Sequence, residues 1–169
     1  MAPPEDRPEC DPPESDPPSP PGPRYNHYYS VRDPTSAEWQ AAWPRLVLDL
    51  RNFFEAILSF WLPQRPIIGD EGIFVDWRGD SARDNLEITR TGPTSLRVVC
   101  MSRRDMDMAV SCILLRAVTL APAEFQLRSD GPWDGEHWLR ARFMSRRQWP
   151  DEVGDDCPWA QYEEAVHSE

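Results

Sequence analysis

The chain has 169 residues, of which 40% are hydrophobic, and its formal net charge is −11 at pH 7. This length suits a single domain with a tail. Phosphate groups repel a chain this acidic, so we expect neither nucleic-acid nor membrane binding, and a protein as the partner.

Residues 1–24 are rich in proline and acidic residues and nearly lack hydrophobic ones. Such a segment buries too little apolar surface to offset its chain entropy, so we expect a disordered tail before a single domain at 25–169. The tail has no apolar signal-peptide core, and charges interrupt every apolar stretch that could span a membrane. We therefore expect a cytoplasmic or a nuclear protein.

The first part of the domain predicts a strand and then helices. Residues 24–31 are aromatic and are typical of a short strand or of a strap on the domain. A T-x-x-E capping box predicts a short helix over 36–43. Pro44 suits the first turn of a second helix, whose apolar residues recur at helical spacing until Pro63.

The middle of the chain alternates between apolar and polar residues, which is the pattern of strands. We expect strands at 72–77, 85–90, 95–102 and 124–129. The stretch from 105 to 120 has apolar residues at helical spacing and predicts a buried helix that Pro122 closes.

The last part of the domain is ambiguous. Residues 136–144 alternate like the second strand of a hairpin, with Leu139 and Phe143 on one side and Trp138 on the other. A helix through 136–148 is the rival interpretation. A short acidic helix is expected from Pro158 onward.

This order of elements, α-β-β-β-α-β-β-α, predicts an α+β domain with a single antiparallel sheet and helices packed on one face. Over about 35–169, the order, size and acidity are similar to those of type III secretion chaperones and the related YbjN-like proteins. The resemblance implies a small protein, usually dimeric, that binds other proteins without catalysis.

Aromatic and basic residues supply the candidate binding surface. The chain has 8 tryptophans, and its one basic cluster follows Trp138. Tryptophan and arginine are typical anchors of protein interfaces. We therefore predict a binding site formed by Trp133, Trp138, Arg140, Arg142 and Trp149. The alternative is that the tryptophans pack the core and the arginines form a solvated face.

No pattern assigns a catalytic residue, a metal ligand or a cofactor. Carboxylates crowd the region between Asp70 and Asp84, but they lack the D-x-D-x-D-G spacing of a calcium loop. His137 lies beside acidic residues without the spacing of a catalytic triad. The 4 cysteines form no C-x-x-C pair.

Residues 77–81 read WRGDS, which contains the integrin-binding tripeptide of many extracellular proteins. Because no secretory signal is visible, we interpret this stretch as the turn between two strands.

We expect a non-enzymatic intracellular protein-binding module, such as a chaperone, an adaptor or an immunity-type protein, with another protein or a second copy as partner. One alternative starts from the basic residues, all 18 of which are arginines. The lack of lysine fits the codon bias of a GC-rich genome. It also fits a viral or host-interaction regulator that avoids conjugation to ubiquitin and recruits proteins through its acidic, proline-rich tail. Another alternative is a small metal-dependent enzyme that uses the carboxylates between Asp70 and Asp84.

Overall fold

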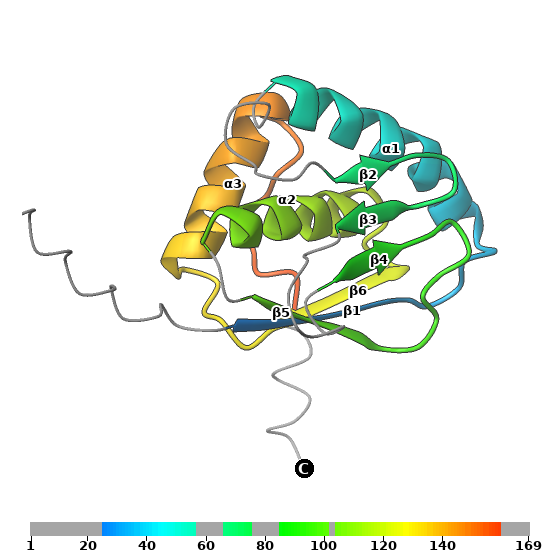
Figure 1. The fold of residues 1–169 in the computed structure, drawn as a ribbon, viewed down its shortest axis with the longest axis horizontal. Coiled ribbons are helices and arrows are strands. Elements are labelled where there is room, and N and C mark those ends of the chain that lie inside the picture. Colours follow the sequence, from blue (N-terminus) through cyan, green and yellow to red (C-terminus); the bar gives the residue numbers. More distant parts are fainter. Residues whose placement is uncertain (1–24, 57–65, 76–84, 102–103, 160–169) are drawn as a thin grey trace, which may run out of the picture.

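The structure is a computed structural model and describes residues 25–56, 66–75, 85–101 and 104–159, with only the backbone at 101 and 104–106. The predicted tail, the WRGDS stretch and most of the predicted final helix lie outside these residues. In chain order the elements are β1 (Tyr25–Val31), α1 (Ala37–Ala56), β2 (Ile67–Ile68), β3 (Ile73–Val75), β4 (Leu86–Ile88), β5 (Arg97–Met101), α2 (Arg104–Leu120), β6 (Phe125–Ser129) and α3 (Glu136–Gln148). The fold is mixed α+β (Figure 1).

The prediction of one sheet is wrong for the described residues, which form two antiparallel sheets of three strands each. The first has the order β5-β1-β6 and the second the order β2-β3-β4. The aromatic segment β1 is the central strand of the first sheet, where Tyr28 stands opposite both Val98 and Arg128. By pairing with β5, this segment places β5 in a different sheet from β3 and β4.

Side chains join the two sheets. The Tyr29 hydroxyl on β1 donates a hydrogen bond to the backbone oxygen of Glu87 on β4 (3.2 Å) and accepts one from its backbone nitrogen (3.1 Å). On the same side, the Trp39 indole of α1 donates to the backbone oxygen of Arg90 (2.8 Å). These contacts satisfy backbone groups that no described strand pairs with, so the sheets and α1 share one core.

The two helices expected around Pro44 form one continuous helix, α1, with Pro44 inside it. The Ser36 hydroxyl accepts a hydrogen bond from the Trp39 backbone nitrogen (3.1 Å) and begins the helix. Apolar residues on both sides of Pro44, including Trp43 and Leu46, are buried along one face. That shared face holds the helix together where the proline removes a hydrogen bond.

The hairpin expected at 136–144 is wrong, and the rival helix is confirmed as α3. Its buried residues include Trp138, Ala141, Arg142 and Ser145, which are spaced as one helical face. Arg142 and Ser145 are polar residues on this buried face, so the apolar residues alone do not show the helical period. Their alternation with polar residues favoured a strand instead. Within the described residues, the strands predicted at 72–77, 85–90, 95–102 and 124–129 are confirmed as β3, β4, β5 and β6.

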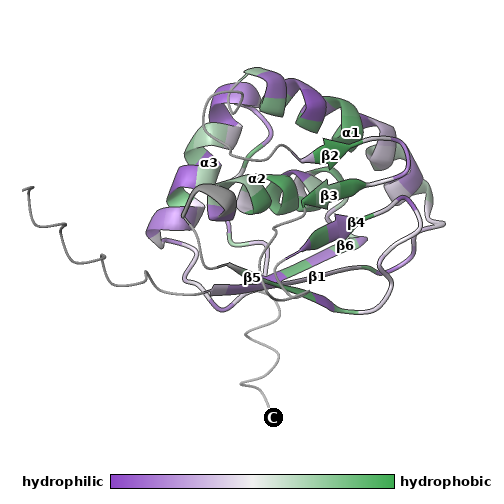
Figure 2. Ribbon diagram, viewed as in Figure 1, coloured by the Kyte–Doolittle hydropathy of each residue, from purple (hydrophilic) through white to green (hydrophobic). Residues whose placement is uncertain are grey.

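Helix α2 lies at the centre of the molecule, with α1 and α3 beside it and β1, β5 and β6 below it in the view of Figure 1. Figure 2 shows that α2 is largely hydrophobic, and every residue from Ala109 to Val118 is buried. None of the described helices is both long and apolar enough to cross a membrane.

Candidate functional site

The predicted binding residues do not form one exposed surface. Trp138 is fully buried and Trp149 is 7% exposed. Trp133 and Trp138 lie together, with ring centres 5.6 Å apart, whereas Trp149 packs on Phe53 of α1. Of the five residues, only Arg140 is exposed. The structure therefore gives the tryptophans a packing role and leaves one predicted residue facing solvent.

Arginines on α3 hold the segment that follows it, residues 149–159, which we call the C-terminal strap. Arg142 donates to the backbone oxygen of Asp155 in the strap (3.4 Å). Its guanidinium also lies 4.4 Å from the Trp133 ring centre and 3.1 Å from a carboxylate oxygen of Asp134, both before α3. Arg146 donates to the backbone oxygen of Gly154 (3.2 Å) and pairs with Asp155. The hydrogen bond and charge of Arg146 lower the pKa of Asp155. These contacts fix α3 relative to the strap.

A buried charge holds the strap to the helices. The Arg116 side chain on α2 is fully buried and lies 2.5 Å from Asp49 of α1 and 3.0 Å from Glu152 of the strap. Its Nη1 meets Glu152 at ion-pair distance without hydrogen-bond alignment. Burial alone would raise the pKa of Glu152, but Arg116 and Arg45 bring it below its usual range. Because the buried Arg116 charge pairs with carboxylates of both α1 and the strap, this network fixes the strap in place.

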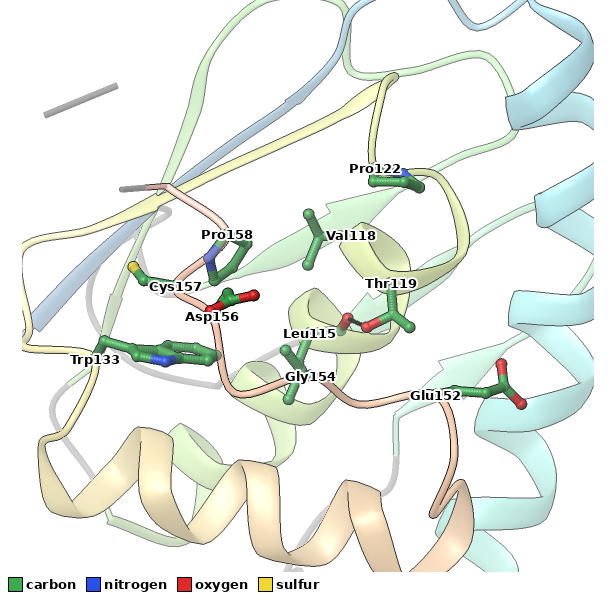
Figure 3. A pocket seen from close by; sticks show the side chains of 10 residues that line it. All are labelled: Leu115, Val118, Thr119, Pro122, Trp133, Glu152, Gly154, Asp156, Cys157 and Pro158. Carbon is green, nitrogen blue, oxygen red and sulfur yellow. Dashed lines mark hydrogen bonds between the residues drawn. The ribbon is translucent and has the colours of Figure 1, made fainter. Parts of the chain in front are cut away.

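A pocket of about 510 Å³ lies between α2 and the strap (Figure 3). It is lined by Leu115, Val118, Thr119, Pro122, Trp133, Glu152, Gly154, Asp156, Cys157 and Pro158. Leu115 and Val118 supply apolar walls from α2, and the strap supplies the carboxylates. Since Glu152 is already paired with arginines, Asp156 is the carboxylate left to meet a positively charged group.

The outer side of α3 carries exposed apolar side chains next to charged ones. Leu139 is 49% and Phe143 61% exposed. Together with Met108 of α2 and Met144, they line an open groove of about 520 Å³. We call the following six residues the α3 outer face: Glu136, Leu139, Arg140, Phe143, Met144 and Arg147. Strand alternation would turn Leu139 and Phe143 inward, which is why the sequence did not single them out.

Arginines flank this apolar surface in an otherwise acidic chain. Arg140 forms an ion pair with Glu136 one turn earlier (2.6 Å), and Arg147 is exposed. Arg142 and Arg146 point toward Asp155 of the strap instead. The α3 outer face therefore offers apolar side chains and two arginines that the strap does not use.

A second cluster of polar side chains lies inside the molecule, where α3 begins. The buried His27 ring nitrogen Nδ1 lies 2.9 Å from the Ser129 hydroxyl. That hydroxyl accepts from the Gly131 backbone (3.1 Å) and the Trp138 indole (3.3 Å), so it donates to His27. Burial and the neighbouring His137 lower the pKa of His27 to about 3, which keeps it neutral. A buried, uncharged pair of this kind supports packing of α3 on β1.

The acidic region between Asp70 and Asp84 is described only in part. The Asp70 side chain is exposed and lies 4.0 Å from Arg51, while Asp76, Asp80 and Asp84 fall outside the described residues. Within the described ranges, no three histidine, cysteine or acidic side chains lie close enough to hold a metal ion.

No protein-family model, no curated protein and no solved structure matches this chain. The similarity to type III secretion chaperones therefore stays a prediction from element order, and the function is argued from the site alone.

Proposed function

We propose that the chain is a protein-binding module that acts through the α3 outer face. The observation that carries this proposal is the exposure of Phe143 (61%) and Leu139 (49%) beside each other on a helix whose opposite side is fully packed. Contiguous exposed apolar side chains with arginines at their edge are typical of protein interfaces.

The support beneath this face favours binding. On the inner side of α3, Trp138 is fully buried and its indole donates to Ser129 of β6 (3.3 Å). Arg142 and Arg146 tie the helix to the strap through the backbone oxygens of Asp155 and Gly154. A surface that is already rigid loses little conformational entropy on binding, which favours affinity.

The charge of the face suggests what it binds. Arg147 would meet an acidic side chain of a partner, and Leu139 and Phe143 would meet apolar or cationic ones. A chaperone, an adaptor or an immunity-type protein in the cytoplasm or the nucleus would each use a surface of this kind.

A capture experiment tests this proposal. The full chain and two variants, Phe143→Ser and Leu48→Ser, would be used as bait in an extract of the native host. Leu48 is a matched control because it is 57% exposed on α1, away from the α3 outer face. Phe143→Ser is expected to lose the captured protein and Leu48→Ser to retain it. Equal capture by all three chains would contradict the proposal.

A further inference from the structure

We infer that the α3 outer face binds a second copy of the chain, with the two α3 helices antiparallel across a two-fold axis. This inference rests on the proposed function and deepens it by naming the partner. The observation that carries it is the order of side chains along the face. When a second copy of the helix runs in the opposite direction, each side chain of the face meets a complementary one.

Four exposed residues follow one line along α3: Glu136, Arg140, Phe143 and Arg147. Their spacing of i, i+4, i+7 and i+11 places them on one side of a helix. When the helix is paired with itself about an axis between residues 141 and 142, Glu136 faces the partner's Arg147. In the same register, Arg140 faces the partner's Phe143.

Each of these pairings is favourable. A glutamate opposite an arginine forms an ion pair, and an arginine opposite a phenylalanine ring forms a cation–π contact. The two-fold axis makes each contact occur twice. Leu139 faces the partner's Met144 in this same register, so the apolar flanks also meet. A single register thus pairs all six residues of the α3 outer face.

The charge distribution supports a second copy at this location. The net charge of the chain is −11, so two copies repel each other over most of their surface. The α3 outer face contains Arg140 and Arg147 against one acidic residue, Glu136, whereas Arg142 and Arg146 pair with Asp134 and Asp155. Contact through this face therefore does not place one acidic surface against another.

The size of the contact predicts a weak dimer. A helix of 13 residues is about 20 Å long, so the pair buries an area at the low end of specific interfaces. We expect reversible association with a dissociation constant on the order of micromolar. Light scattering of the full chain would give 19.5 kDa when dilute and approach twice that mass when concentrated.

Charge reversal tests the register. Glu136→Arg alone and Arg147→Glu alone each place like charges opposite one another, and each is expected to weaken self-association about tenfold or more. A mixture of the two variants restores both ion pairs and should associate like the wild-type chain. Thermal unfolding of each variant checks that Glu136→Arg, which also loses its ion pair with Arg140, still folds.

The outcomes separate this inference from the proposed function. Concentration-dependent dimers that Phe143→Ser abolishes, that Leu48→Ser keeps and that the mixture restores would support it. A wild-type chain that stays monomeric, or a mixture that associates no better than either variant, would overturn it. If such a monomer still captures another protein through Phe143, the proposed function stands and the second copy is ruled out.

Discussion

The Arg142 guanidinium lies 4.4 Å from the centre of the Trp133 ring, and this stacked pair joins α3 to the loop before it. The same guanidinium reaches backbone oxygens of Trp133 and Asp155 (both 3.4 Å) and the Asp134 carboxylate (3.1 Å). One buried side chain therefore holds α3, its preceding loop and the C-terminal strap together. The α3 outer face depends on this support, although Arg142 does not belong to it.

Replacing Arg142 with methionine should destabilise the fold. Arg142→Met removes the stacking on Trp133 and leaves backbone oxygens without a donor, so we expect a loss of about 2 kcal/mol in the free energy of unfolding. Urea denaturation followed by tryptophan fluorescence measures it. Arg140→Met is the control, because Arg140 is exposed and should change stability by no more than about 0.5 kcal/mol. Equal losses in both variants would contradict the assigned role of Arg142.

Tyr29→Phe should weaken the junction of the two sheets. The variant keeps the buried ring but leaves the Glu87 backbone oxygen and nitrogen without the hydroxyl that bonds both. We expect a loss of about 2 kcal/mol in the free energy of unfolding. Tyr28→Phe lies on the same strand with its side chain on the other face and should cost little. If Tyr28→Phe costs as much as Tyr29→Phe, the hydroxyl does not connect the sheets.

The buried His27 should make stability fall in mild acid. Burial, with His137 beside it, lowers the pKa of His27 to about 3, whereas the unfolded chain takes up the proton near 6.5. The contribution of neutral, buried His27 to the free energy of unfolding is therefore complete above pH 6.5 and is lost as the pH falls toward 3. Each such group contributes a slope of about 1.4 kcal/mol per pH unit in this window.

The variant His27→Gln tests this slope. Unfolding free energies would be measured between pH 6.5 and 5, where most carboxylates stay ionised. The slope should become shallower in His27→Gln and should retain a part from His137, whose pKa burial also lowers. An unchanged slope would show that His27 takes up its proton in the folded chain as easily as in the unfolded one.

Asp107 on α2 should have the opposite pH dependence. Burial raises the pKa of Asp107 to about 7, and its Oδ1 has no hydrogen-bond partner among the described residues. The folded chain thus binds this proton more tightly than the unfolded chain, so stability falls as the pH rises from about 4 to 7 and stays lower above it.

The amide variant Asp107→Asn removes that penalty. We expect it to raise the free energy of unfolding at pH 8 by about 1 to 2 kcal/mol, less than the full pKa shift implies because water still screens part of the carboxyl. The gain should disappear toward pH 4, where the native carboxyl is protonated. The exposed Asp151→Asn is the control. A gain that does not depend on pH would contradict the account.

Part of the fold is predictable from the sequence for a physical reason. Helices α1 and α2 and strands β3, β4 and β6 carry apolar residues at the period of their own geometry, because each buries one face against the core. Pro44 marked a helix boundary in the sequence, but burial on both sides of it kept α1 continuous. At Pro44, tertiary packing therefore outweighs the low helix propensity of proline.

The rest depended on contacts between distant segments. The position of β1 between β5 and β6 follows from pairings such as His27 with Ser129, which no local pattern contains. The site was missed because Arg142, which the strap and Trp133 bury, occupies the inner face of α3. If the sequence is interpreted as a helix with Arg142 on its buried face, Leu139 and Phe143 fall on the exposed face. Arg140 is the predicted binding residue that remains in the proposed site.

Oxidative footprinting of side chains tests the α3 outer face most directly. Hydroxyl radicals modify exposed phenylalanine, methionine and leucine side chains, and the sites of modification are read by mass spectrometry. In the full chain bound to its partner, whether a second copy or another protein, Phe143 and Met144 should be protected, while Leu48 should react as in the free chain. Formation of the complex with no change at Phe143 and Met144 would contradict the claim that this face binds the partner.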